Sequence, residues 1–102
     1  MALAGIMFMF YEDAPKLTRH GDFINGKLIS SAVDVAISGT VNLAIPGNCT
    51  YVVIYSDAEV YSLISVGAAT VTQATKADLI PIDTRVGFAV GPLEDNISYK
   101  AA

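Results

Sequence analysis

Residues 40–66 read TVNLAIPGNCTYVVIYSDAEVYSLISV, and this stretch decides the fold class. Apolar residues alternate with small or polar ones over 41–45, which is the period of a strand with one buried face. A Pro-Gly-Asn turn at 46–48 follows, and the run at 50–55 is then apolar on both faces, as in a strand covered on each side. After a Ser-Asp turn, residues 59–66 have strand character again. The stretch predicts three short strands separated by turns.

The same pattern continues on both sides of this stretch. Further runs with strand character lie at 4–10, 23–30, 32–38, 70–75, 85–90 and 96–101. Asn25-Gly26 favours a type I′ hairpin within 23–30, because both residues tolerate positive φ. Pro81 lacks an N–H group, so the segment 76–84 is predicted to be an edge strand or a loop. About seven to nine short strands at this spacing predict an all-β domain, a small antiparallel β-sandwich or barrel.

The N-terminal residues allow two interpretations. One is an N-terminal arm and linker over 1–21, which adds a strand to a neighbouring subunit, followed by a β-sandwich domain over 22–102. In that case a chain that lacks residues 1–11 still folds. The other is an ordinary first strand of the same sandwich. The residues expected to form the interface are Ile6, Met7, Phe8, Met9, Phe10 and Tyr11.

The composition indicates a protein that needs neighbours. Hydrophobic residues make up 53% of the 102 residues and charged residues only 16%, whereas soluble domains carry about 25% charged residues. The surplus apolar surface of so small a domain must meet a membrane or another protein. The longest apolar run, 1–11, is about half the ~20 residues that a spanning helix needs, so we expect no membrane partner. A net charge of −4 argues against a nucleic-acid partner.

No group of residues suggests chemistry, and we expect no enzyme, no cofactor and no catalytic or metal site. His20 and Cys49, one residue of each kind, are the only combination that a small enzyme could use, and they cannot complete a structural zinc site. No phosphate-binding glycine motif occurs. Tyr51 and Tyr55 share a face at even spacing. These tyrosines and Tyr61 suit core or interface packing, with a carbohydrate platform as the alternative.

Residues 40–101 also have a recognisable layout: TVNLAIPGNCTYVVIYSDAEVYSLISVGAATVTQATKADLIPIDTRVGFAVGPLEDNISYKA. An apolar strand ends in Ile-Pro-Gly, and an aromatic and apolar strand leads to an Asp turn. A strand ending in Val-Gly, an Ala-Thr tract and Leu-Ile-Pro-Ile-Asp-Thr follow, before the last two strands. This order resembles the small β-sandwich virion proteins of tailed bacteriophages, of the capsid decoration (cement) or head-associated type.

The resemblance implies a structural virion protein, made in the host cytoplasm, that binds and stabilises an assembled capsid. It implies the major capsid protein or other virion proteins as partners, and a homo-oligomer such as a trimer. Two alternatives stay open: a head–tail or tail component, and a module that binds carbohydrate or a host surface.

Overall fold

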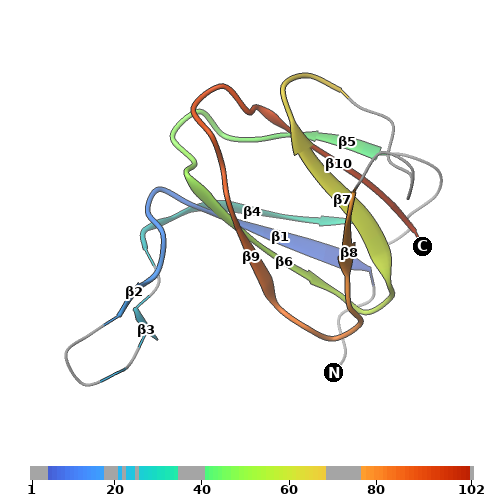
Figure 1. The fold of residues 1–102 in the computed structure, drawn as a ribbon, viewed down its shortest axis with the longest axis horizontal. Coiled ribbons are helices and arrows are strands. Elements are labelled where there is room, and N and C mark those ends of the chain that lie inside the picture. The colour runs from blue at the N-terminus through green and yellow to red at the C-terminus, as the bar shows by residue number, and fades with distance from the viewer. Residues whose placement is uncertain are drawn as a thin grey trace.

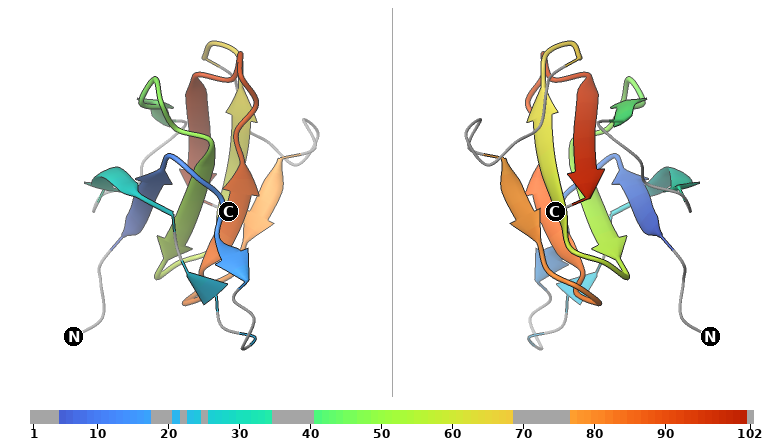
Figure 2. Two further views of the ribbon diagram at one scale, coloured as in Figure 1. Left: turned by 90° about the vertical axis from the view of Figure 1, so that its left-hand side faces the viewer. Right: turned by 90° about the vertical axis from the view of Figure 1, so that its right-hand side faces the viewer.

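The computed structural model describes residues 5–17, 21, 23–24, 26–34, 41–68 and 77–101. These residues form two four-stranded antiparallel sheets that pack as two layers (Figure 1, Figure 2). The first sheet has the order β4-β1-β6-β9, with strands Leu28–Asp34, Ile6–Tyr11, Tyr51–Ser56 and Val86–Ala89. The second sheet has the order β5-β10-β7-β8, with strands Val41–Ala44, Asn96–Ala101, Val60–Ser65 and Asp78–Ile80. The predicted all-β sandwich is confirmed, and the sheets do not close into a barrel.

β1 and β6 form the centre of the first sheet. Phe8 lies opposite Ile54 on β6 and Ala32 on β4. Along β6, buried and half-buried residues alternate, and Val52 and Ile54 are fully buried. The segment 50–55 is therefore a central strand of its sheet, but the prediction that both of its faces are covered is wrong, because Tyr51, Val53 and Tyr55 are only half-buried.

The structure decides between the two interpretations of the N-terminal residues. β1 pairs with β4 on one side and β6 on the other, and its inward side chains are buried in the core. Residues 6–11 are therefore an ordinary strand of the sandwich and not an arm outside it. The expected boundary between residues 21 and 22 falls inside a hairpin of β2 (Lys16–Leu17) and β3 (Phe23–Ile24), which projects from the two layers (Figure 1). Residues 1–4 lie outside the described residues.

The hairpin predicted at Asn25-Gly26 is wrong, because β3 pairs with β2 and β4 pairs with β1. Asn25 itself lies outside the described residues. Gly26 instead allows two backbone segments to approach closely: a Cβ at this position would lie 2.8 Å from the carbonyl carbon of Asp13. Beside this contact, the amide of Glu12 donates a hydrogen bond to the carbonyl oxygen of Lys27 at 2.9 Å. The glycine thus serves the junction between β1 and β4.

β10 is the most buried strand of the second sheet, with four consecutive buried residues from Asn96 to Tyr99. Ile97 and Tyr99 face the core, whereas Asn96 and Ser98 face away from it. On that side Ser98 Oγ donates to Asn42 Oδ1 at 2.6 Å, and Asn96 Nδ2 donates to Ser98 Oγ at 2.8 Å. Buried polar groups need such partners, so this network stabilises the pairing of β5 with β10.

The remaining strand predictions have clear outcomes. Every second side chain of β9 and the residue after it, namely Val86, Phe88 and Val90, faces the core, as the pattern at 85–90 predicts. β8 is an edge strand that ends immediately before Pro81, because proline cannot donate to the ladder. The predicted separation of the runs 23–30 and 32–38 is wrong, because β4 continues from Leu28 to Asp34. The segments at 35–38 and 70–75 lie outside the described residues.

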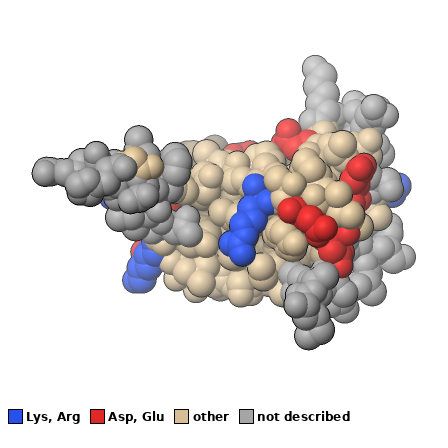
Figure 3. All heavy atoms as spheres, turned by 90° about the horizontal axis from the view of Figure 1, so that it is seen from below, with Lys and Arg blue, Asp and Glu red and all other residues tan. Residues whose placement is uncertain are grey.

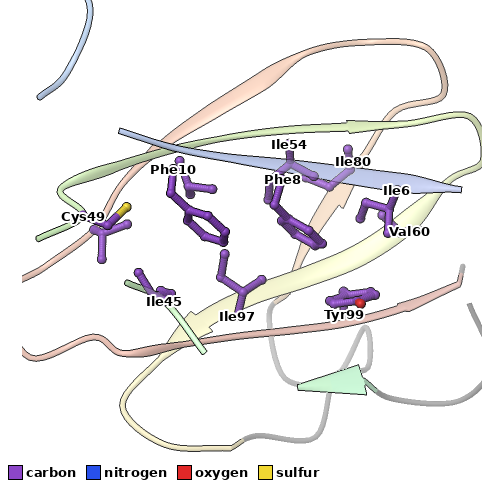
Figure 4. Close-up of a cluster of buried hydrophobic side chains, with 12 residues drawn as sticks. Ile6, Phe8, Phe10, Ile45, Cys49, Ile54, Val60, Ile80, Ile97 and Tyr99 are labelled. Carbon is purple, nitrogen blue, oxygen red and sulfur yellow. The ribbon is translucent and has the colours of Figure 1, made fainter. Parts of the chain in front are cut away.

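The core lies between the two sheets (Figure 4). Its aromatic centre is Phe8, whose ring centroid lies 6.4 Å from that of Phe10 and 4.9 Å from that of Tyr99 on the second sheet. The other buried members come from both sheets and the turns between them: Ile6, Ile45, Cys49, Val52, Ile54, Val60, Ile80, Val90 and Ile97. Burying one large side chain of this kind stabilises the fold by about 1.5–3 kcal/mol.

Candidate functional site

The outer face of the first sheet consists of the residues that alternate with the core. On β1 and β6 these residues form three cross-strand pairs, because Met7 lies opposite Tyr55, Met9 opposite Val53 and Tyr11 opposite Tyr51. Cross-strand neighbours on one face of a sheet cover each other, which explains why most of them are half-buried. We call this surface the outer apolar face; its residues are Met7, Met9, Tyr11, Tyr51, Val53 and Tyr55.

The outer apolar face contains no charged residue. In Figure 3, which looks onto this side of the molecule, uncharged side chains cover most of the described surface, and basic and acidic side chains lie beside one another across part of it. No third layer of described strands packs against it (Figure 2). Aromatic residues, methionine and arginine are enriched at protein interfaces, whereas lysine and glutamate are depleted there. The composition of this face is thus that of an interface rather than of an ordinary solvated surface.

A hollow of about 500 Å³ opens at the Tyr11–Tyr51 end of this face. Its lining residues are Tyr11, Ala14, Pro15, Tyr51, Val53, Arg85 and Gly87. The phenol of Tyr51 lies across β9 at Gly87, where an added Cβ would overlap the hydroxyl and lie 2.5 Å from Cζ. A glycine in the strand therefore lets the ring lie against the neighbouring backbone.

Polar groups border the other end of the outer apolar face. Tyr55 Oη donates a hydrogen bond to Asp83 Oδ1 at 3.2 Å. This hydrogen bond, together with the negative charges of Asp83 and Asp57, raises the pKa of Tyr55 above its ordinary value. A tyrosine hydroxyl is protonated at neutral pH in any case, so it acts as a donor here. A polar margin around an apolar centre is the usual anatomy of an interface.

A second hollow, of about 440 Å³, lies where the turns around residues 46–49 and 91–95 meet. Cys49 is buried at its wall and its thiol donates a hydrogen bond to the carbonyl oxygen of Tyr51 at 3.2 Å. Burial raises the pKa of this thiol, which makes Cys49 a poor nucleophile. His20 lies outside the described residues, so the structure places only one member of the His20–Cys49 pair.

The carboxylates near this second hollow have structural partners. Glu94 Oε1 accepts a hydrogen bond from the amide of Gly91 at 2.7 Å, and Asp95 Oδ1 accepts one from the amide of Gly67 at 2.8 Å. Within the described residues, no three His, Cys, Asp or Glu side chains are grouped as a metal site requires. These two side chains thus stabilise turns.

The six residues predicted to form the interface separate into two sets. The set buried in the core, which a partner cannot reach, is Ile6, Phe8 and Phe10. The set on the outer apolar face is Met7, Met9 and Tyr11. Sequence reasoning missed the β6 half of this surface, although the even spacing of Tyr51 and Tyr55 indicated that they share a face.

Comparisons of the chain with protein-family models, curated proteins and solved structures found no match. Nor do the described residues include any helix long and apolar enough to cross a membrane. Because the comparisons found no match, the structural features that indicate a function are the outer apolar face, its polar margin and the two hollows.

Proposed function

We propose that this chain is a structural virion protein that binds and stabilises an assembled phage capsid, as decoration (cement) proteins do, and that the outer apolar face makes the contact. The observation that carries the proposal is that face: tyrosines, methionines and a valine meet on the two central strands of a sheet without a charge among them. Burying such apolar surface against a partner gains about 25 cal/mol per Å².

The geometry of the face suits a protein surface as its partner. Its residues are held on paired strands, so little side-chain and backbone freedom is lost when the face docks. The tyrosine hydroxyls and the guanidinium of Arg85 at the hollow can direct hydrogen bonds to a protein backbone. Both features favour a protein surface as the partner.

The resemblance of residues 40–101 to phage decoration proteins supports the kind of partner, which is the major capsid protein or another virion protein. A head–tail or tail component would use the same surface in the same way. The net charge of −4 favours a protein lattice over packaged nucleic acid. The protein would then be found in the virion.

Val53→Asp is expected to weaken binding to heads purified from the phage that encodes this chain by about thirtyfold or more, the effect of losing about 2 kcal/mol at an interface hot spot. Val53 is half-buried in the middle of the outer apolar face, so a carboxylate there would be desolvated by the partner without a counter-charge. Co-sedimentation of purified protein with the heads measures the bound fraction.

Leu63→Asp is the matched control, because Leu63 is half-buried on β7 and faces outward from the second sheet. It should bind like the wild type, and circular dichroism shows whether both variants are folded. Failure of the wild type to bind heads, or equal binding by the two variants, would contradict the proposal.

One observation favours a second function, the binding of carbohydrate or a host surface. The hollow at Tyr51 combines aromatic rings with the hydroxyl and guanidinium groups that orient a polar ligand. We expect glycan-array binding to be lost in Tyr51→Ala and kept in Tyr61→Ala, because Tyr61 lies on the second sheet, outside this hollow. A wild-type protein that binds no glycan would count against this function.

A further inference from the structure

Among the strands that the structure describes, β4 is an edge strand with no neighbour on its outer side. It is seven residues long and pairs only with β1. Among the described residues, the backbone hydrogen bonds of this segment are those of the β1 ladder and the bond from Glu12 to Lys27. The side chains at 28, 30, 31 and 33 are exposed. An edge strand presents a row of unpaired N–H and C=O groups, which can pair with another strand.

The other edge strands are short within the described residues. β5 and β9 have four residues each and β8 has three, with Pro81 at its end. Short edge strands, prolines and lysines are the usual means by which proteins block unwanted pairing. β4 has neither proline nor lysine, and its one charged residue is Asp34 at the end of the strand. Its register with β1 shifts between Leu28 and Ser30, so the regular part of this edge is 30–34. β4 is thus the edge best suited to continue a sheet.

We propose that β4 pairs antiparallel with β4 of a second copy of this chain, so that the two first sheets become one continuous sheet. A pairing centred on Ser31, the middle residue of the strand, lies on the part of β4 that follows the shift in register between Leu28 and Ser30. It places Ser30 opposite Ala32 of the other copy, and the one charged residue of the strand, Asp34, lies at its end, so no like charges meet. The strand is therefore complementary to itself, as a two-fold symmetric interface requires.

This pairing has a consequence for the outer apolar face. Ser31 and Val33 lie opposite Met9 and Met7 on β1, so they belong to the same side of the sheet as that face. Residues opposite each other in an antiparallel pair point to the same side. The dimer would therefore present both outer apolar faces on one side, as a surface twice as wide. The inference rests on the edge of β4 and holds whether or not the protein binds a capsid.

Light scattering on the purified protein tests the pairing. The wild type should have twice the chain mass of 10.7 kDa, and Ser31→Lys and Val33→Lys should have the mass of one chain. In Ser31→Lys two lysines would face each other across the two-fold axis. Leu79→Lys is the control: Leu79 is 48% exposed on the edge strand β8, close to the 51% of Val33, and this variant should remain a dimer.

Ser31→Cys tests the register without adding charge. Directly opposite Cβ atoms in an antiparallel pair are close enough for a disulfide, so mild oxidation should give a covalent dimer. Thr84→Cys, in an exposed turn, should give no covalent dimer under the same oxidation. A wild type that is monomeric or trimeric, a Ser31→Lys variant that stays dimeric, or the absence of the Ser31→Cys cross-link would overturn the inference. Since only the purified chain is present, each result is independent of capsid binding, and Val53→Asp should remain a dimer.

Discussion

Phe8→Ala is expected to lower the free energy of unfolding by about 3–5 kcal/mol. Phe8 is buried at the aromatic centre of the core, with its ring centroid 4.9 Å from that of Tyr99 on the opposite sheet. Removing the ring loses buried apolar surface and leaves a cavity that the two sheets can only partly close. Domains of this size have a total stability of about 5–15 kcal/mol, so much of it would be lost.

Urea denaturation measures this loss, and Met7→Ala is the control from the same strand. Met7 points outward and is half-buried, so its removal should cost about 1 kcal/mol. Equal losses in the two variants would show that β1 does not contribute its inward face to the core. A chain that lacks residues 1–11 should not fold at all, because the first sheet would lose a central strand.

Gly26→Ala is expected to destabilise the protein by about 1–3 kcal/mol, the usual cost of overpacking. The added Cβ would lie 2.8 Å from both the carbonyl carbon and the Cβ of Asp13. A backbone atom cannot rotate out of the way as the end of a side chain can, so the two segments must separate. That movement would strain the 2.9 Å hydrogen bond between Glu12 and Lys27 at the junction of β1 and β4.

Gly47→Ala is the matched control for this substitution. An added Cβ at Gly47 meets nothing within 4 Å, and the φ angle there is not positive. The change should be neutral or stabilise by about 0.4–1 kcal/mol through the unfolded chain. Thermal unfolding compares the two variants, since 1 kcal/mol shifts the midpoint by about 4–8 °C in a domain of this size. A Gly26→Ala midpoint equal to or above that of the control would show that the close approach is absent.

Local alternation was sufficient to predict most strands of the sandwich. β5, β6, β7, β9 and β10 were recognisable because the period of two reports which side chains of a strand are buried. The same local reasoning failed at Asn25-Gly26. An Asn-Gly pair favours a tight turn, but Gly26 is needed for a contact with Asp13 that lies outside any local window.

Only the β1 half of the candidate site was predicted, because local patterns do not show which distant strands lie side by side. Met7 and Met9 were expected at an interface, but the pattern of β1 could not show that Tyr55 and Val53 would lie beside them. Tyr51 and Tyr55 were known to share a face, yet whether that face was covered depended on the strands around it.

The sequence by itself determined an all-β chain with more apolar residues than its own core can use and few residues suited to chemistry. Only the tertiary structure decided that 6–11 is a central strand, that β1 lies beside β6 to form the outer apolar face, and that β4 is the long open edge. The physical reason is that hydrophobic periodicity specifies which side chains are buried, but not their partners. Strand order results from competition among pairings distant in sequence, which is resolved when both sheets pack on one core.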